Sequence, residues 1–321
     1  MPQHHNLPAR PETCHWGFFD AALKPVLTVA SGDTVTLDSV SGGPDMLPQS
    51  GQFEILPEHL AIHRALSPQL GAHILTGPIA VAGAEPGDVL EIEILAIACR
   101  QNWGYTRIRP LSGTLPEDFP VRRVWHTAID RQLAVGTLPW GSEIALAPFF
   151  GVMGVAPPPV WGAVTSVVPR EFGGNMDLKE LVAGTTLYLP VWAPGALFSA
   201  GDGHAVQGDG EVCVTALETA LTGTFRLTLR KDLGFRLPRA ETPSHHITMG
   251  FDEDLDDAAK TALRQMLLLL RDRLGLAAED AYMFASLAVD LRVTQLVDGN
   301  KGIHAMLKKP KPMPGGVARF G

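Results

Sequence analysis

The sequence predicts a mainly β protein with a helical C-terminal layer, an α+β arrangement on an antiparallel, sandwich- or barrel-like body. Apolar and polar residues alternate in short runs over most of residues 15–235. The chain holds 33 glycines and 26 prolines, mostly in this region. Such a density favours short strands joined by turns over parallel βαβ units. A helical period dominates only after about residue 243.

A recurrent unit marks the β-rich part: an apolar strand, a glycine-containing turn and an alternating strand. It occurs at residues 25–38 and 79–94, and in a looser copy at 181–191. We expect the units to form strand pairs, as in a repeated β motif of irregular period.

Other segments of this part break the alternation. Residues 57–66 have the period of a short helix, and residues 101–125 are expected to be strand and loop with exposed aromatics, including Trp103 and Tyr105. The Gly- and Pro-rich segment 148–177 predicts a long irregular loop, and its apolar content favours a functional loop over a disordered one.

The C-terminal part has the start and stop signals of helices. Residues 254–273 place acids at the front, bases at the back and an apolar stripe between them, and Gly275 follows. A second helix is expected from about residue 278 to 289. These features divide the chain into a β-rich body, residues 1–240, which carries the site, and a helical layer, residues 241–321, packed on it.

Composition restricts the partners and the compartment. Lys and Arg number 26 against 34 Asp and Glu, a net charge of -8, and this balance disfavours a nucleic-acid partner. Three cysteines without a CxxC pair fit a reducing compartment. Residues 1–12 lack the apolar core of a secretory signal, and the apolar stretch near residues 266–270 is too short to span a bilayer. We therefore expect a cytoplasmic protein that acts on a small molecule and not at a membrane.

The stretch from Gly195 to Cys213 concentrates polar residues among glycines. Asp202 and His204 are two apart, as are Asp209 and Glu211, so each pair points to one side of an extended chain. A carboxylate and an imidazole on one side can hold a borderline cation such as zinc. The alternative is a Gly-rich hairpin whose polar side chains satisfy turn backbone, and spacing alone leaves both open. An alternating strand is expected to follow at residues 212–216.

The run Leu-Phe-Ser-Ala-Gly-Asp-Gly-His-Ala-Val-Gln-Gly-Asp-Gly-Glu-Val, residues 197–212, resembles the signature of the acetamidase/formamidase family. The resemblance covers most of the chain and includes residues 76–78, 83–88, 148–157 and 173–177. It implies hydrolysis of short aliphatic amides such as formamide or acetamide to carboxylate and ammonia, a bound metal and a homo-oligomer. The segment 14–17, Cys-His-Trp-Gly, departs from the Asn-rich segment of better-known formamidases, which leaves the substrate open.

The resemblance also assigns roles. It implies that Asp177 joins Asp202 and His204 as metal ligands around an open position for water. The divalent ion is expected to be zinc, which lowers the pKa of bound water to about 7. Glu211 is the candidate general base and later proton donor to ammonia. A loop acid in a turn and a solvated strand-edge carboxylate are the alternatives for Asp177 and Glu211.

Four further residues are candidates for lining a substrate site. His15 and His73 match family positions of this kind, and Phe149 and Phe150 are candidates for the wall of a small pocket. Histidines held by core hydrogen bonds and aromatics packed in the core are the alternatives.

Other functions stay open at this stage. One is a cysteine-dependent amidase with Cys213 as nucleophile, although that thiol lies in an apolar stretch. The other is a non-catalytic β-rich binding protein that keeps the fold, because function depends on the site and not on the fold.

Overall fold

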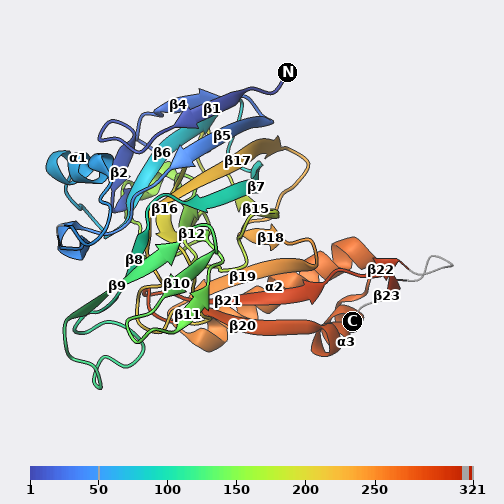
Figure 1. Ribbon diagram of the computed structural model, residues 1–321. Coiled ribbons are helices and arrows are strands. Elements are labelled where there is room, and N and C mark those ends of the chain that lie inside the picture. Colours follow the sequence, from blue (N-terminus) through green and yellow to red (C-terminus); the bar gives the residue numbers. More distant parts are fainter. Residues whose placement is uncertain (50, 313–317, 320–321) are drawn as a thin grey trace.

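The computed structural model describes residues 1–49, 51–312 and 318–319 (Figure 1). Its longest feature is a nine-stranded sheet that runs from the N-terminal strand to the C-terminal helices. In spatial order its strands are β1 (His4–Leu7), β5 (Asp33–Asp38), β17 (Leu221–Arg230), β7 (Val89–Cys99), β15 (Thr185–Pro190), β18 (Arg239–Glu241), β19 (His245–Asp252), β21 (Lys301–Lys308) and β20 (Val289–Gln295).

A six-stranded sheet lies against this one. Its strands are β14 (Gly173–Asn175), β12 (Phe149–Gly154), β16 (Phe198–His204), β6 (Ile74–Val81) and β2 (Cys14–Trp16), with β4 (Leu27–Val29) beside β6. A four-stranded sheet contains β11 (Glu143–Ala145), β10 (Val135–Thr137), β9 (Arg123–Asp130) and β8 (Trp103–Ile108). Short pairs are made by β3 (Phe18–Phe19) with β13 (Val164–Thr165) and by β22 (Lys311–Pro312) with β23 (Ala318–Arg319).

The main core fills the space between the two larger sheets. Phe150 and Phe198 of the six-stranded sheet pack on Phe225 of the nine-stranded sheet, with ring centroids 5.4 and 5.9 Å apart. Apart from β1–β5 and β4–β6, the strand pairs of the described residues are antiparallel, and neither sheet closes on itself there. The mainly β, antiparallel body is therefore confirmed, as an open sandwich and not a closed barrel.

The predicted strand pairing within the recurrent units is wrong. In residues 25–38, β4 pairs with β6 while β5 pairs with β1 and β17 of the other sheet. In residues 79–94, β6 and β7 likewise belong to different sheets. Alternation reports which face of a strand is buried and does not identify the neighbouring strand. The units 25–38 and 79–94 therefore each connect the two sheets, whereas the unit 181–191 contains one strand, β15.

Two other local expectations are also corrected. The segment 148–177 contains β12 and β14 and is not one irregular loop. Trp103 and Tyr105 are 0% and 5% exposed, because they pack with Met46 of a short 3-10 helix, η1 (Pro44–Met46). A second such helix, η2, spans Pro159–Trp161.

The three predicted helices are confirmed as α1 (Pro57–Ala65), α2 (Leu255–Leu274) and α3 (Ala278–Ala288). The Asp254 carboxylate accepts the first free N–H groups of α2, and Gly275 ends the helix with a left-handed φ of 67°. The apolar face of α2 packs on β19 and β21 (Figure 1). Among the described residues, no helix combines the length and apolar composition that a membrane span requires.

The C-terminal part continues the large sheet. Strand β18 pairs with β15 on one side and with β19 on the other, so the sheet passes through residue 240 without interruption. The division at residue 240 stays a prediction, and residues 313–317 and 320–321 of the second part lie outside the described residues.

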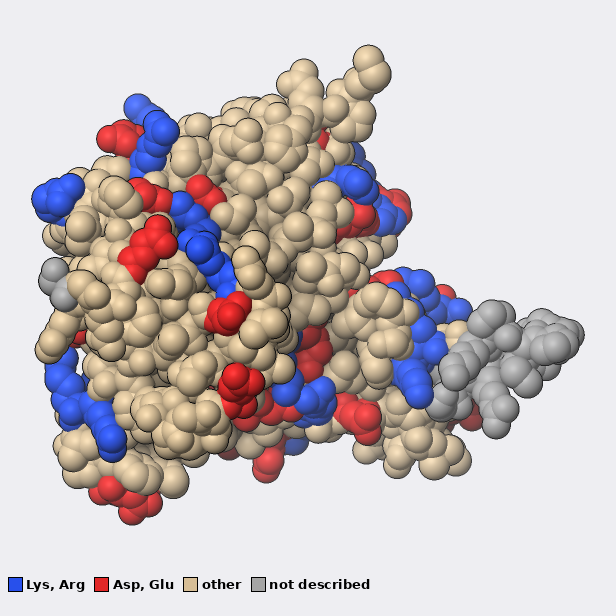
Figure 2. Space-filling model, viewed as in Figure 1, with Lys and Arg blue, Asp and Glu red and all other residues tan. Residues whose placement is uncertain are grey.

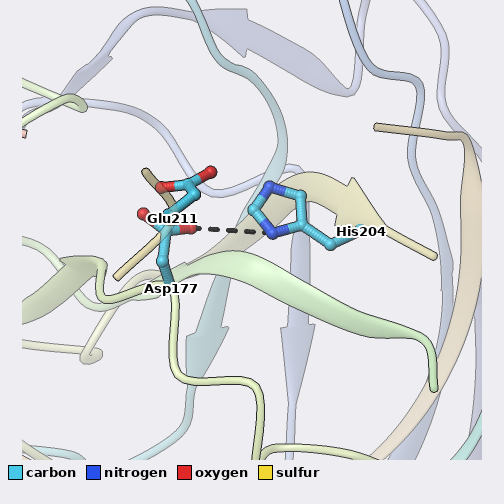
Figure 3. Close-up of side chains that lie close together, drawn as sticks. All are labelled: Asp177, His204 and Glu211. Carbon is cyan, nitrogen blue, oxygen red and sulfur yellow. Dashed lines mark ion pairs between the residues drawn. The ribbon is translucent and has the colours of Figure 1, made fainter. Parts of the chain in front are cut away.

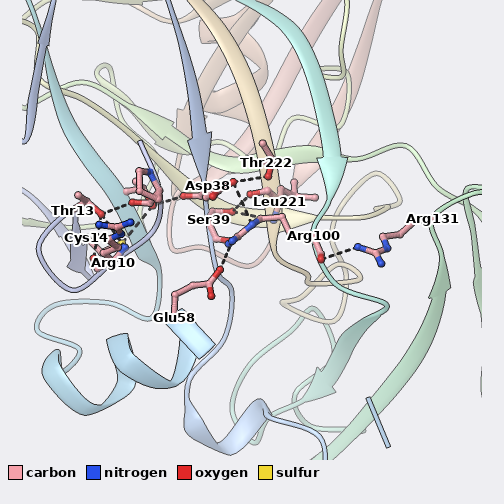
Figure 4. A network of polar contacts seen from close by, with 12 residues as sticks. Arg10, Thr13, Cys14, Asp38, Ser39, Glu58, Arg100, Arg131, Leu221 and Thr222 are labelled. Carbon is pink, nitrogen blue, oxygen red and sulfur yellow. Dashed lines mark hydrogen bonds and ion pairs between the residues drawn. The ribbon is translucent and has the colours of Figure 1, made fainter. Parts of the chain in front are cut away.

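A partly buried network anchors the segment that precedes η1. The guanidinium of Arg100 donates to the carbonyl of Ser39 at 3.0 Å, lies 3.3 Å from the carboxylate of Asp38, and pairs with Glu58 of α1 (Figure 4). Since charge-assisted bonds are stronger than neutral ones, this network fixes α1 and the chain after β5 to the sheet.

Candidate functional site

Strand β16 carries the centre of the site. Asp202 and His204 project from the same side of this strand, and Nε2 of His204 lies 3.1 Å from Oδ2 of Asp202. Both side chains are buried. The structure thus brings together the pair expected from the two-residue spacing.

Gly151 on the neighbouring strand β12 leaves the space in which the site residues meet. A Cβ atom at this position would lie 2.4 Å from Oδ1 of Asp177, 2.7 Å from the ring of His204 and 2.9 Å from Oδ2 of Asp202. The backbone N–H of Asp177 donates to the Gly151 carbonyl at 3.2 Å and fixes this acid beside β12. Glycine is required here because the site occupies the position of a side chain.

Glu211 completes this group from another loop. Figure 3 shows its carboxylate beside that of Asp177, both on the same side of His204. The preceding residue, Gly210, makes two backbone hydrogen bonds at the end of β20. Its N–H donates to the carbonyl of Thr294 at 3.0 Å, and its carbonyl accepts from the N–H of Leu296 at 3.1 Å. Strand β20 of the C-terminal part therefore holds the Glu211 loop in place.

An ion-pair cluster holds the same loop from the other side. Arg292 of β20 pairs with Asp209 and, at 2.9 Å, with Glu180, which follows Asp177 by three residues. Asp209 also pairs with Lys179 at 3.0 Å. Asp209 is thus a structural residue, and Arg292 links the two segments that carry Asp177 and Glu211.

The alternating strand expected at residues 212–216 is absent. Glu211 and Val214 have φ values of 43° and 65°, and Val212 is 61% exposed, so this segment turns instead of pairing. Asp177 and Asp202 also have positive φ values, 48° and 55°. Left-handed backbone at a non-glycine residue costs on the order of 1–3 kcal/mol, and such strain concentrates at functional sites.

Sequence reasoning missed Glu218. Its Oε1 lies 3.1 Å from Nε2 of His204, and its Oε2 accepts a hydrogen bond from Ser41 at 3.1 Å. Glu218 is the only Asp, Glu, Lys, Arg or His between Val212 and Phe225. A single acid in such an apolar run was the available signal, because a buried charge needs a partner.

Asp298 was also missed. It follows β20, is 5% exposed, and its carboxyl faces that of Asp177. Its context, Asp-Gly-Asn, is that of an ordinary turn, so the sequence held no signal for it.

Gln207 sets the orientation of the imidazole. Its side-chain nitrogen donates to the carbonyl of Asp177 at 2.9 Å, which leaves its Oε1 to accept from Nδ1 of His204 at 2.9 Å. With the proton on Nδ1, the Nε2 atom faces the carboxylates of Asp202 and Glu218. This nitrogen is thereby available to a proton or a cation between those acids.

The charges around His204 are tightly coupled. Burial would lower the pKa of His204, but the carboxylates of Glu218 and Asp202 outweigh it and raise this pKa well above the usual value. Burial would raise the pKa of Asp202, yet His73 and His204 hold it below its usual value. Burial, followed by the charge of Asp202, raises the pKa of Glu218.

The remaining acids, Asp177, Glu211 and Asp298, have little positive charge beside them; Oδ1 of Asp177 lies 3.8 Å from Nδ1 of His204. Burial, then the charges of Glu211 and Asp298, raise the pKa of Asp177 well above its usual value. Burial and the neighbouring carboxylates do the same for Glu211, and burial raises the pKa of Asp298 to about 6. Carboxylates buried this close together repel one another, so they are stabilised either by taking up protons or by binding a cation.

A divalent cation fits this set of donors. Two trios, Asp177–His204–Glu211 and Asp202–His204–Glu218, each place their ligand atoms within 4.8 Å of one another. Within the described part of the chain, both Asp177 oxygens are buried without a hydrogen-bond donor; they face the carboxyls of Glu211 and Asp298, and Oδ1 lies 3.8 Å from Nδ1 of His204 (Figure 3). Imidazole and carboxylate ligands suit zinc and similar ions.

The four predicted lining residues occupy different places. His73 lines the cavity above the site, with Nδ1 2.9 Å from Ser166 and Nε2 3.9 Å from Asp202. Phe149 packs edge-on against His204, with ring centroids 5.0 Å apart, whereas Phe150 belongs to the core. His15 is buried behind β16, where it contacts Ser199 at 3.1 Å, and burial lowers its pKa to about 4.

The cavity that opens onto the acids has a volume of about 540 Å³. Asp202, Glu211, Glu218 and Asp298 line it on one side. Cys213 does not line it; its thiol donates to the carbonyl of Arg107, and burial raises its pKa. The structure therefore disfavours a cysteine nucleophile, which needs a low pKa.

Comparison with known proteins decides the family. The model of the acetamidase/formamidase family matches residues 25–164 and 160–310. The chain belongs to this family.

Solved members of the acetamidase/formamidase family share the whole fold. The acetamidase of Bacillus halodurans superposes with a TM-score of 0.82 at 33% identity, covering 94% of this chain and 97% of that one. A predicted acetamidase/formamidase from Thermoanaerobacter tengcongensis gives a TM-score of 0.84 at 25% identity and 96% coverage of both chains. The acetamidase of Mycolicibacterium smegmatis is 31% identical over 198 residues, 44% of this chain, and the matched segment spans about half, 49%, of its length.

Proposed function

We propose that this member of the family hydrolyses the C–N bond of short primary amides to a carboxylate and ammonia, with a divalent cation, zinc, held by the buried acids and His204. The observation that carries the proposal is the convergence of four acids, Asp177, Asp202, Glu211 and Glu218, on His204. Gly151 leaves the space for Asp177, Asp202 and His204. The names of the relatives point to the same reaction.

The residues divide the chemistry among them. His204 presents Nε2 to the ion because Gln207 holds its Nδ1 proton, and Asp202 and Glu218, which form one trio with His204, supply carboxylate ligands. Asp177, whose Oδ1 lies 3.8 Å from the other ring nitrogen, is the further proposed ligand. A divalent ion bound there polarises an amide carbonyl and makes water more acidic. Glu211, with its raised pKa, accepts the proton of the attacking water and returns it to the departing nitrogen.

The predicted lining residues fit supporting roles in this scheme. His73 lines the cavity, which supports a role for it in contacting the substrate. Phe149 orients the His204 ring, and His15, through Ser199, supports β16 from behind. Phe150 fixes β12 against the core.

The test is ammonia release from formamide and acetamide, before and after metal removal and with zinc restored. Glu211→Gln should abolish turnover, whereas Glu143→Gln, an exposed acid on β11, should leave it unchanged. Absence of ammonia from every amide in the zinc-loaded protein contradicts the proposed reaction. Full turnover after exhaustive metal removal contradicts the role of the ion.

We also propose a cytoplasmic homo-oligomer without a nucleic-acid or membrane partner. On the face shown in Figure 2, Lys and Arg are scattered among Asp and Glu and form no single basic surface, which supports a small-molecule partner. Cys14, Cys99 and Cys213 are all unpaired, as in reducing compartments. Met283 and Leu287 of α3 are 69% and 87% exposed, which supports association, and light scattering in solution tests it.

A further inference from the structure

The cavity is larger than the simplest amides require. Formamide and acetamide have only a few non-hydrogen atoms each, whereas a cavity of about 540 Å³ is in the range that holds drug-sized ligands. The acids occupy one side of it. The side chains that line the remaining space therefore indicate which chemical group the substrate has in addition to its amide.

That lining is cationic, and strand β8 supplies it. Tyr105 lies beside Glu218, because their backbones exchange hydrogen bonds of 2.9 and 2.8 Å. Arg107 and Arg109 follow at two-residue intervals and also line the cavity. A rise of about 3.3 Å per residue places Arg107 about 7 Å beyond Tyr105, and Arg109 directly follows the end of β8 at Ile108.

Neither guanidinium has an acidic partner among the described residues. The Nε atom of Arg107 is buried without a hydrogen bond, and its Nη1 contacts only the sulfur of Met46, at 3.8 Å. Arg109 bonds to the hydroxyl of Ser112 at 2.9 Å. Asp45, the one acid that lines this end, already pairs with Arg122 at 3.3 Å. Arg109 is exposed at the mouth of the cavity; partial desolvation, followed by the charges of Arg107 and Arg122, lowers its pKa, as expected for cations that lack counter-charges.

We propose that the preferred substrate is a primary amide that carries a carboxylate at its other end, the monoamide of a short dicarboxylic acid. This inference rests on the proposed amide hydrolysis. Arg107, assisted by Arg109, binds the carboxylate, and the amide lies beside Asp202, His204 and Glu211. Water adds to the amide carbon, the C–N bond breaks, and a dicarboxylate and ammonia leave.

The charge distribution also sets the direction of binding. The acids repel a carboxylate from their side of the cavity, while an unpaired guanidinium forms its strongest bonds with a planar carboxylate. An anionic amide therefore enters with its amide toward the acids. A neutral amide of the same length lacks this constraint and binds less well.

The experiment compares succinamate and glutaramate with butyramide as a neutral amide of similar length. We expect kcat/KM for the anionic amides to exceed that for butyramide by about 10- to 100-fold, since a hydrogen bond to a charged group contributes about 1.5–3 kcal/mol. Arg107→Gln should lower kcat/KM for the anionic amides to the value for butyramide measured with the same variant, mainly through KM. Arg123→Gln, an exposed arginine on β9 outside the cavity, is the matched control.

The outcomes separate the two proposals. Hydrolysis of butyramide at least as efficient as that of both anionic amides overturns the inference and leaves amide hydrolysis standing. Absence of ammonia from every amide overturns the proposed function itself. If Arg107→Gln does not fold, competition on the unmodified protein replaces it: succinate should inhibit more strongly than butyrate, and equal inhibition overturns the inference.

Discussion

The side-chain oxygen of Gln207 lies 2.9 Å from Nδ1 of His204, and this contact determines which imidazole nitrogen faces the acids. Because the Gln207 amide nitrogen is already bonded to the Asp177 carbonyl, the oxygen accepts and the histidine donates. A neutral side chain three residues along the loop thus prepares Nε2 of His204 for a cation.

Gln207→Met should therefore weaken the site without dismantling it. Loss of an outer hydrogen bond to a metal-binding histidine lowers metal affinity or activity by about 10- to 100-fold. Zinc affinity is measured by competition with a chromophoric chelator, and Gln132→Met, at an exposed position, is the control. Unchanged affinity and turnover contradict the assigned role of Gln207.

Gly151→Ala should abolish zinc binding and turnover. The new methyl group would lie 2.4 Å from Oδ1 of Asp177, so the acids must separate to admit it. Gly234→Ala is the control, since nothing lies within 4 Å of a Cβ atom there. The readouts are metal content and circular dichroism; a folded Gly151→Ala protein with normal zinc content would refute this description of the site.

Glu218→Gln tests a residue that the sequence did not reveal. The substitution should leave the fold intact, because the amide oxygen at the Oε1 position still accepts from the Ala216 N–H and the NH2 group at the Oε2 position donates to the Ser41 hydroxyl. It removes one charge beside Nε2 of His204, and we expect zinc affinity and kcat/KM to fall by about 10- to 100-fold. Wild-type values in a well-folded variant would exclude Glu218 from the site.

Metal removal should destabilise the protein. A ligand at 100 to 1,000 times its dissociation constant stabilises the folded state by about 2.7–4.1 kcal/mol, and the metal-free acids also repel one another. Chelation should lower the melting temperature, and zinc should restore it. Asp177→Asn should melt higher than the unmodified protein in chelator and lose most of the zinc effect; a lower melting temperature in chelator would argue against repulsion among these acids.

Glu241 should give the stability a dependence on acidic pH. Burial would raise its pKa, but His246 and Lys309 outweigh it and lower the pKa from 4.5 to about 2. The unfolded chain therefore binds more protons between these values, and stability falls as the pH drops from about 4.5 to 2. Urea unfolding across this range should show that Glu241→Gln removes about 1–2 kcal/mol of the dependence, allowing for partial solvent screening. An unchanged pH profile would contradict this assignment.

Local sequence features predicted the elements better than their partners. Helix α2 follows from its own signals, since Asp254 and Gly275 act within a turn of its ends. Strands β4 and β5 were recognised as strands, but their placement in different sheets depends on contacts with β6 and β17, far away in sequence. The strand expected after Glu211 failed because the positive φ of Glu211 and Val214 is imposed by the surroundings.

The same limit applies to the site: local patterns predicted residues within one stretch and did not report residues brought in from distant segments. Asp202, His204 and Glu211 lie in one glycine-rich stretch, where spacing and family resemblance both apply. Asp298 reaches them only because β20 bonds to Gly210, a contact across more than eighty residues that no local pattern reports. Glu218 lacked a motif of its own and was marked only by its apolar neighbours.

The way successive strands pass between the two sheets has a consequence for biosynthesis. Strand β17, near residue 225, lies between β5 and β7, and β20 lies at the sheet edge opposite β1. A ribosome-bound chain that ends before β17 leaves the facing edges of β5 and β7 unpaired, because the strand that bonds to both has not yet been synthesised. Such nonlocal pairing slows folding, and nascent chains of this protein should be frequent clients of holding chaperones until the last strands emerge.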